Sequence, residues 1–228
     1  MRITPAKSSS VIVLVGHLNP RIFLPTWFSK NGVIGQEEGE NAEIELVHRD
    51  LVKFKLDWLT VVVEHGRFIV ELDQPPDIRL FDFAQKTFTE LLVHTPIWAM
   101  GINKHIEFDA GSAEKRDKIG FTLAPPQAWG EWSESILKGS DSNHGGMMSL
   151  SMRQTDTDDR PDGYIQAKVE PSKLITNGVY VEVNDHYSLP QGEDIEGCAE
   201  IMEIMARNFD SSIARSEMIV DQVMGIVK

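Results

Sequence analysis

The chain has 228 residues, of which 41% are hydrophobic and 25% are charged, and its formal net charge is −13. This composition is typical of an ordinary globular protein with one large domain or two small ones. No stretch approaches the roughly 20 apolar residues that a membrane helix needs. The acidic balance, without a basic stripe, argues against direct binding to nucleic acid or anionic membranes and favours either solubility or a basic partner.

The cysteine content and the N-terminal sequence bear on the cellular compartment. Cys198 is the only cysteine, so an internal disulfide framework is excluded. The longest apolar run near the start, Val11–Val15, is too short for the core of a signal peptide. These features predict a cytoplasmic protein.

The N-terminal part of the chain alternates between apolar and polar residues in several short runs. Val11–Leu18 predicts a strand, and Pro20–Lys30 predicts a short apolar helix near a proline. A region rich in β-branched and aromatic residues follows and predicts a sheet with one buried face. Its expected strands are Ile44–His48, Val52–Leu56, Leu59–Glu64 and Phe68–Leu72.

A long amphipathic helix is predicted after this sheet. Pro75-Pro76 ends the last strand, and Asp77 is a candidate helix N-cap. Apolar residues at helical spacing over Ile78–Leu92 predict a helix that packs on the sheet. The period then returns to two, and Trp98–Phe108 predicts a strand whose apolar side has one polar exception, Lys104.

The order of elements recurs in the second part of the chain. The polar segment 109–117, DAGSAEKRD, is a candidate linker. Ile119–Leu123 is strand-like, and a proline-initiated helix with two tryptophans follows from Pro125. The remaining elements are three strands and two helices: Met147–Met152, Tyr164–Val169, Val179–Val183, a long helix from Asp194 and a final helix from about Ser216.

Two stretches of the chain are similar to each other. GRFIVELDQPP (Gly66–Pro76) and GVYVEVNDHYSLP (Gly178–Pro190) each begin with glycine, alternate in polarity and lead through a turn into a helical pattern. Internal duplication explains this recurrence with one assumption; the rival interpretation is a single α+β sheet with chance local similarity. We predict an α+β fold of two similar halves, residues 1–108 and 118–228. Each half is expected to be a curved antiparallel sheet with a short Pro-started helix and one long helix, and the second carries an extra C-terminal helix.

Two short segments resemble a known group of proteins. Met100-Gly101-Ile102-Asn103, after the first long helix, and Phe209–Ile213, before the C-terminal segment, resemble a sporadically distributed family of uncharacterised prokaryotic proteins of similar length. The Arg-Tyr pair that typically precedes the asparagine in that family is missing here. The resemblance implies duplicated α+β halves and no known enzymatic activity.

Several short motifs are similar to catalytic or metal-binding motifs, but each lacks a required residue. His48-Arg49-Asp50-Leu51 begins like a kinase catalytic loop, yet Lys55 stands where a metal-binding asparagine is needed. The run Asp156–Gly163 has Pro161, and later Ala167, where a calcium loop needs glycine and glutamate. The seven histidines lack zinc-type spacing, and no phosphate loop or dinucleotide fingerprint is present. We therefore assign no catalytic, cofactor-binding or metal-binding residue.

One catalytic interpretation stays open, because residues distant in sequence can converge in the fold. His94 or His105 together with Glu107 and Asp185 is one such combination.

The leading prediction is a non-enzymatic protein-binding subunit of a prokaryotic multi-protein system, such as a host-defence or regulatory assembly. Its basis is the lack of recognisable chemistry together with five tryptophans among abundant large apolar residues. Candidate partner-binding residues are Trp129, Trp132, Met218, Asp156, Asp158 and Asp159. One alternative is an acidic inhibitor or nucleic-acid mimic that occupies a basic surface on a partner; a second is an enzyme of unrecognised class. Self-association into a homo-oligomer is also allowed.

Overall fold

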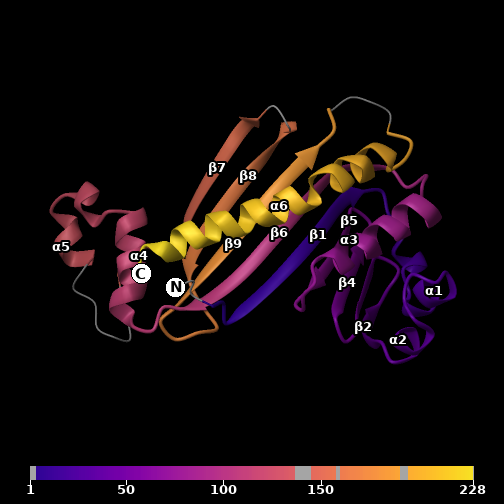
Figure 1. The fold of residues 1–228 in the computed structure, drawn as a ribbon, viewed down its shortest axis with the longest axis horizontal. Helices are drawn as coiled ribbons and strands as arrows, with labels where there is room; N and C mark the ends of the chain where they lie inside the picture. Colours follow the sequence, from indigo (N-terminus) through magenta and orange to yellow (C-terminus); the bar gives the residue numbers. More distant parts are fainter. Residues whose placement is uncertain (1–3, 137–144, 158–159, 191–194, 228) are drawn as a thin grey trace.

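The computed structural model describes residues 4–136, 145–157, 160–190 and 195–227. These residues form a nine-stranded antiparallel sheet with its longest helix lying across one face (Figure 1). The strand order is β2-β3-β4-β5-β1-β6-β9-β8-β7. The predicted α+β class, with antiparallel strands and packed helices, is therefore confirmed.

The strands divide into two wings that meet at the central pair of β1 and β6. The N-terminal wing comprises β1 (Lys7–Gly16), β2 (Glu43–Val47), β3 (Leu51–Lys55), β4 (Leu59–Glu64) and β5 (Arg67–Leu72). The C-terminal wing comprises β6 (Ile97–Asp109), β7 (Leu150–Thr157), β8 (Arg160–Pro171) and β9 (Gly178–Ser188). Each of these strands overlaps a stretch that the sequence predicts as a strand, because alternation of polarity marks strands with one buried face.

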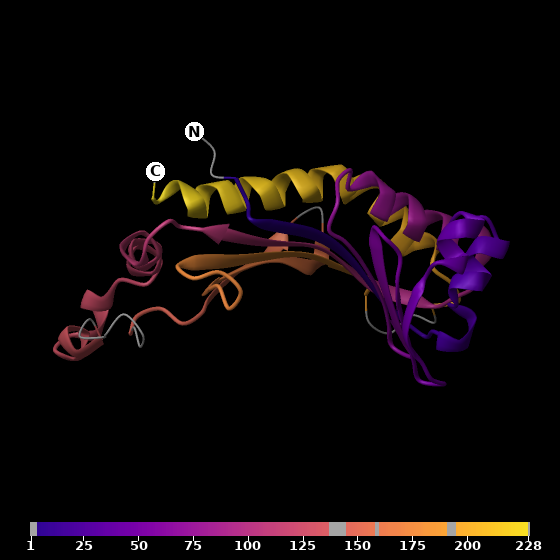
Figure 2. The same ribbon diagram turned by 90° about the horizontal axis from the view of Figure 1, so that it is seen from below.

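One face of the sheet, the helix face, is covered by α3 (Ile78–Gln85), the π-helix η2 (Lys86–Leu91) and α6 (Ala199–Gly225) (Figure 2). Side chains on this face form two apolar clusters. The larger cluster lies mainly in the N-terminal wing and includes the buried rings of Phe23, Phe28, Phe54, Phe68 and Phe88. The smaller lies in the C-terminal wing and includes Ile106, Phe108, Val181, Val183 and Val220. Each fully buried side chain of this size contributes about 2–3 kcal/mol of hydrophobic stabilisation.

Helix α6 connects the two clusters. Near its N-terminal end, the Phe209 ring lies 5.2 Å from the Phe81 ring between centroids, so α6 packs beside α3. The Gln85 Nε2 also donates to the Met202 carbonyl at 3.0 Å. The C-terminal part of α6 covers the other wing, where Met224 belongs to the smaller cluster.

The continuity of α6 corrects the prediction of two C-terminal helices with a boundary near Ser216. The structure has one helix over Ala199–Gly225. Ser212 and Ser216 are almost completely buried between the two apolar parts of this helix. Two serines at four-residue spacing interrupt the apolar stripe without interrupting the helix, because small side chains allow close approach to the sheet.

A second correction concerns α4 (Ala113–Leu123), which occupies part of the expected linker and the expected strand Ile119–Leu123. The Ser112 hydroxyl accepts a hydrogen bond from the Lys115 backbone N–H at 3.3 Å and so caps the helix. Ile119 is fully buried in the smaller cluster. The strand prediction is wrong because a short apolar run fits both helical and strand periods.

The short helices lie at the two ends of the molecule (Figure 1). A 3-10 turn η1 (Pro20–Ile22), α1 (Pro25–Lys30) and α2 (Gln36–Glu40) belong to the N-terminal end; η3 (Pro126–Trp129) and α5 (Trp132–Ile136) follow α4 at the other end. Both proline-initiated segments therefore contain short helical turns, as predicted. No helix among the described residues combines the length and the hydropathy needed to cross a bilayer.

The one polar exception predicted on the apolar side of β6 has specific partners. Lys104 is 6% exposed, and its Nζ donates to Ser10 Oγ at 2.8 Å and to Asp77 Oδ2 at 3.1 Å. Asp77 stands at the N-cap position of α3 but makes no side-chain capping bond; instead it accepts from the Ser10 hydroxyl at 2.6 Å. The predicted N-cap position is therefore confirmed, but the Asp77 side chain ties α3 to β1 and β6 instead of capping the helix.

Candidate binding surface

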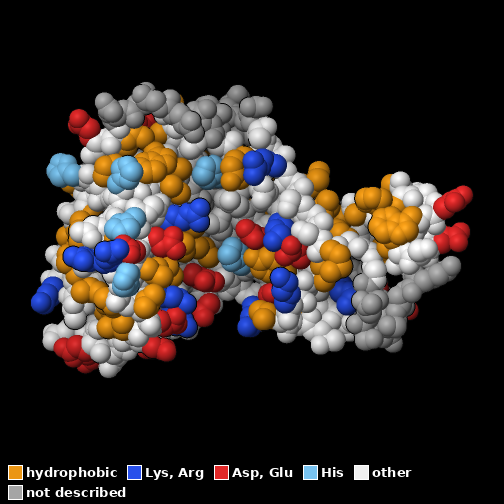
Figure 3. Space-filling view, turned by 180° about the vertical axis from the view of Figure 1, so that it is seen from behind, with side chains coloured by type: hydrophobic (Ala, Val, Ile, Leu, Met, Phe, Trp, Pro, Cys, Tyr) orange, Lys and Arg blue, Asp and Glu red, His pale blue; other side chains and the backbone are white. Residues whose placement is uncertain are grey.

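The second face of the sheet, the open face, has neither α3 nor α6 over it. Figure 2 shows these helices above the sheet, while the outer strands of the N-terminal wing and the α4–α5 segment bend away to the opposite side. The open face is consequently concave. Figure 3 looks onto this side of the molecule and shows apolar, acidic, basic and histidine side chains interspersed over it.

On the N-terminal wing the open face carries an apolar strip, formed by Val11, Val13, Val15, Val62 and Ile69. These residues alternate with core residues of the same strands. In the strand pairing, Val13 is opposite Ile69 and Ile69 is opposite Val62. Val11 is buried and the other four are half-buried, although no long helix covers them. A continuous apolar row in this position is typical of a contact surface.

Charged side chains border the apolar strip on the outer strands. Glu45 accepts ion-pair contacts from Lys53 at 2.6 Å and from Lys55. The hydrogen bonds from Lys53 and Lys55 lower the pKa of the Glu45 carboxyl. Exposed ion pairs of this kind contribute little to stability, so these residues form a polar rim of the type that surrounds apolar interface patches.

On the C-terminal wing the open face carries a polar strip. Its members are Asn103, His105 and Glu107 on β6 and Tyr180, Glu182, Asn184 and His186 on β9. Strand pairing places Asn103 opposite Asn184. It also places Asn103 opposite Val11 of the apolar strip, so the polarity of the face changes between the two central strands.

The outer side of the polar strip contains an ordered set of planar groups. The Arg153 guanidinium donates to Gln166 Oε1 at 2.7 and 3.0 Å and lies 3.9 Å from the centre of the Tyr164 ring. The Tyr164 ring stacks on His186 with 4.6 Å between centroids. Burial, and secondarily the Arg153 charge, lower the pKa of His186, while Asp185 acts in the opposite direction. Neutral His186 is therefore the favoured form at neutral pH.

Three buried polar atoms of the polar strip have no hydrogen-bond partner within the described part of the chain: Asn103 Oδ1, Asn184 Oδ1 and Glu107 Oε2. Asn103 is 8% exposed and Glu107 is 9% exposed. Buried polar groups in native proteins are nearly always paired, with protein or with water. A carboxylate can only accept hydrogen bonds, so Glu107 indicates a donor in whatever contacts this surface.

One end of the polar strip is acidic. The Tyr180 hydroxyl donates to Glu182 Oε2 at 3.2 Å. Burial raises the pKa of Tyr180 above its usual range, and the nearby charges of Glu182, Glu107 and Glu170 raise it further. Carboxylates that stabilise the protonated phenol also favour a cation beside it.

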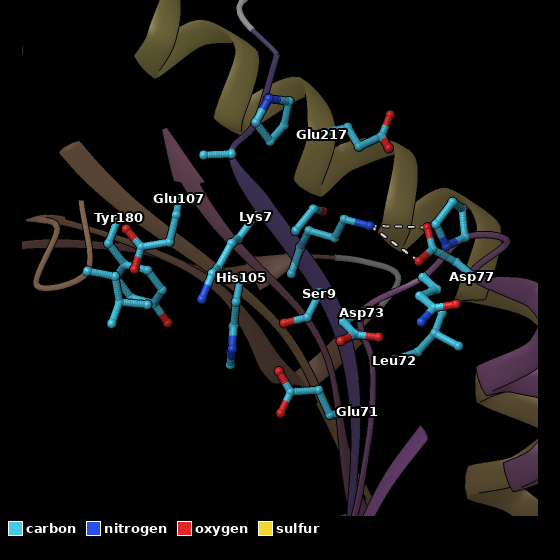
Figure 4. Close-up of a pocket in the computed structure, with 17 residues that line it drawn as sticks. Lys7, Ser9, Glu71, Leu72, Asp73, Asp77, His105, Glu107, Tyr180 and Glu217 are labelled. Atoms are coloured by element: carbon cyan, nitrogen blue, oxygen red, sulfur yellow. Dashed lines mark hydrogen bonds and ion pairs between the residues drawn. The ribbon is translucent and has the colours of Figure 1, made fainter. Parts of the chain in front are cut away.

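A pocket of about 760 Å³ opens beside this acidic end, where β5 stops and β1 continues (Figure 4). Lys7, Ser9, Glu71, His105 and Glu107 project into it from the open face. The Lys104–Asp77 ion pair and Glu217 lie on the side of α6. The pocket therefore lies at an edge of the sheet and is lined by residues from both faces.

The residues of the catalytic combination that the sequence left open do not converge, because they lie on different faces of the sheet. His105 and Glu107 share the open face, but no hydrogen bond or ion pair joins them in the described structure. Asp185 is fully buried on the helix face, where its Oδ2 forms an ion pair with Arg215 Nη1. His94 lies in the turn before β6. No group of three or more metal-ligating side chains occurs among the described residues.

Three of the predicted partner-binding residues, Trp129, Trp132 and Met218, lie on helices and not on the open face of the sheet. Trp129 and Trp132 are 60% and 59% exposed on η3 and α5, with 5.5 Å between their ring centroids. Met218 is 56% exposed on α6, on the opposite side of the sheet. Asp156 belongs to β7, and Asp158 and Asp159 lie outside the described residues. The structure thus brings the two tryptophans together but not with Met218.

Sequence reasoning missed most of the polar strip. Asn184 lies just beyond the predicted strand Val179–Val183, and its pairing with Asn103 depends on the register of β6 and β9. The available signal was the polar side of β6: Asn103, His105 and Glu107 occur at every second position of a strand whose other side is largely apolar.

In comparisons with known proteins, no family model and no curated sequence matches this chain. The sequence resemblance to uncharacterised prokaryotic proteins adds no functional assignment. A function for this chain is therefore inferred from the geometry of its open face.

Proposed function

We propose that the protein is a non-enzymatic protein-binding subunit of a larger assembly and that it holds its partner on the concave open face. The observation that supports this most strongly is the junction of the apolar strip with the polar strip along β1 and β6. An apolar patch bordered by polar groups that lack internal partners is the arrangement found at protein interfaces. A solvated outer surface instead leaves its polar groups in contact with water.

The two strips assign different roles within this proposal. The apolar strip supplies contact area to a partner, and each apolar side chain that the partner covers contributes about 25 cal/mol per Å². The polar strip supplies acceptors and stacked planar groups that determine orientation. The partner is expected to carry apolar residues next to hydrogen-bond donors, among them Arg or Lys.

The finer prediction of two similar halves becomes part of the same proposal. Pairing runs β1–β5–β4–β3–β2 in one wing and β6–β9–β8–β7 in the other. Each series begins with a long strand, passes through short helices and returns through consecutive strands into a helix: β2 to β5 and α3 in the first wing, β7 to β9 and α6 in the second, so the first wing has one strand more. We interpret the wings as two copies of one unit. The strand β6, which the sequence analysis placed at the end of the first half (residues 1–108), is in this interpretation the first strand of the second copy. The concave face is then the surface that both copies share.

Co-purification tests the proposal directly. The tagged full chain is expressed in the cells that encode it, beside Ile69→Lys in the apolar strip and the control Met218→Lys on α6. Both variants introduce lysine at an apolar position, so they change the net charge equally. We expect a stoichiometric partner with wild type and Met218→Lys and at least a tenfold loss with Ile69→Lys, provided that the thermal unfolding of all three is similar.

The same experiment separates the remaining interpretations. Recovery of a partner by Ile69→Lys but not by Met218→Lys would move the interface to α6, and a clean monomer in every sample would contradict a binding subunit. The acidic-inhibitor alternative requires an association that weakens steeply between about 0.1 and 0.5 M salt, because exposed charge pairs are screened at these concentrations. If the partner is lost with Trp129→Ala and Trp132→Ala but is retained with Ile69→Lys, the interface lies on the predicted tryptophans.

A further inference from the structure

Next to the pocket, one edge of strand β1 has no neighbouring strand among the described residues. β5 pairs with β1 only over Ser10–Val15, whereas β6 pairs with β1 from Lys7 onwards. Beyond Leu72 the chain leaves the sheet and turns into α3. The segment Lys7–Ser9 therefore has a strand on one side and the pocket on the other. We call this place the β1 slot.

The β1 slot has space for an extended chain. Pro5 and Ala6, together with Lys7–Ser9 at the start of β1, line one wall of the 760 Å³ pocket, and residues 71–75 line the other. A strand placed here would lie in the plane of the sheet and continue the direction of β5. Strands add to exposed edges through main-chain hydrogen bonds, with alternate side chains providing specificity.

Glu107 is the side chain whose chemistry indicates the occupant. It lines the pocket, is 9% exposed, and its Oε2 has no partner among the described residues. Pairing places Lys7 opposite Glu107, so Glu107 lies one strand beyond β1. Neighbouring strands are about 4.8 Å apart, and a residue added beside β1 would therefore be about 10 Å from β6. An extended Arg or Lys side chain covers most of that span, and the glutamate covers the rest.

The charges around the slot favour a basic segment. Glu71 and Asp73 line its outer wall, and Glu107 lies across from them. Of the cationic groups in the lining, Lys104 is already bonded to Asp77, which leaves Lys7 and His105 as the other basic side chains. Carboxylates outnumber cations, in the same sense as the net charge of −13 of the whole chain.

From these observations we infer that the β1 slot binds an extended segment of the partner as an added strand, and that an Arg or Lys of this segment donates to Glu107. The inference deepens the proposed function and depends on it, since it specifies which part of a protein partner is held. Main-chain pairing with Lys7–Ser9 provides affinity for an extended conformation. The buried acceptor selects the basic side chain.

The test uses fluorescence anisotropy with the full chain and defined peptides. The probe is a fluorescein-labelled library of octapeptides rich in Thr and Val, in which a single Arg is moved through successive positions. The matched library carries citrulline in place of Arg, which keeps the shape and removes the charge. We expect one Arg register to bind at least tenfold more tightly than its citrulline counterpart.

One substitution in the protein and one modification of the peptide test whether the peptide binds in the β1 slot. Glu107→Gln should weaken the best peptide about tenfold or more, whereas Glu64→Gln, at an exposed acidic position at the end of β4, should leave its affinity unchanged. N-methylation of alternate peptide residues should abolish binding when the methylated amides face β1 and leave it largely intact in the other register.

Three results would each refute the inference: equal binding of Arg and citrulline peptides, equal loss with Glu107→Gln and Glu64→Gln, and insensitivity to N-methylation in both registers. If Glu107→Gln unfolds the protein, peptide N-methylation still decides the question with the wild-type chain. A partner that co-purifies with wild type but not with Ile69→Lys, together with no peptide binding, would leave the proposed function intact and remove only the slot.

Discussion

The two faces of β6 are buried to a similar degree, but their polar groups are paired differently. On the helix face, Lys104 bonds to Ser10 and Asp77. On the open face, Asn103 Oδ1 and Glu107 Oε2 lack a partner among the described residues. On the helix face, Ser10 of β1 and Asp77 at the start of α3 supply the hydrogen-bond partners; neither of these described elements supplies a partner on the open face. At β6, the buried polar group on the helix face is thus paired within the fold, whereas those on the open face retain hydrogen-bonding capacity for another molecule.

The largest expected effect comes from breaking a buried pair on the helix face. Arg215→Met leaves the carboxylate of Asp185, whose side chain is 1% exposed, without its cation. Removal of one partner of a buried pair costs about 3 kcal/mol, so the free energy of unfolding in urea should fall by about that amount. Arg207→Met, at an exposed position of the same helix, is the control and should change stability by less than about 0.5 kcal/mol. Equal effects of the two substitutions would contradict a stabilising role for the pair.

A smaller loss is expected from Lys104→Met, which removes the donor to Ser10 and Asp77. Asp77 is partly exposed, so water can solvate its carboxylate and limit the cost to about 2 kcal/mol. Urea unfolding of the full chain measures this change. The double variant Lys104→Met with Asp77→Asn should recover part of it, because the remaining group is then neutral; a further loss would show that the ion pair is not the reason.

The adjacent position on the opposite face should behave differently. Asn103→Val replaces an unpartnered polar side chain with one that suits a strand, and we expect the free energy of unfolding to stay within about 0.5 kcal/mol of wild type or to rise by about 1 kcal/mol. The same variant should weaken partner binding in co-purification. A loss of stability similar to that of Lys104→Met would remove the distinction between the two faces.

The smallest effect concerns the protonation of His186. Its pKa is lowered in the folded state, first by burial and then by Arg153. The unfolded chain therefore binds this proton more readily, so the stability due to neutral His186 is present above about pH 6.5 and is lost as the pH falls through the lowered folded pKa. Arg153→Gln should raise the pKa of His186 in an NMR titration of the imidazole resonances. Arg207→Gln is the control, and an equal shift in both variants would exclude a local charge effect.

The sequence alone predicted the elements whose signal is local. Alternation of polarity located each strand, and apolar spacing from Ile78 located the helix on the sheet. The same reasoning identified Lys104 as an anomaly but could not name Asp77 as its partner, because that contact joins α3 to a strand that comes after it in the chain. It also mistook α4 for a strand, since a run as short as Ile119–Leu123 does not distinguish the two periods.

Composition and periodicity by themselves determined an acidic α+β protein with amphipathic strands and helices. Only the tertiary structure decided that β6 lies at the centre of the sheet, that one continuous α6 spans both wings, and that Asn103 lies opposite Asn184 on the same uncovered face as Glu107. The physical reason is that the alternation along a strand depends on its own residues, whereas its neighbours, its register and the face that receives a helix depend on contacts between residues far apart in the chain.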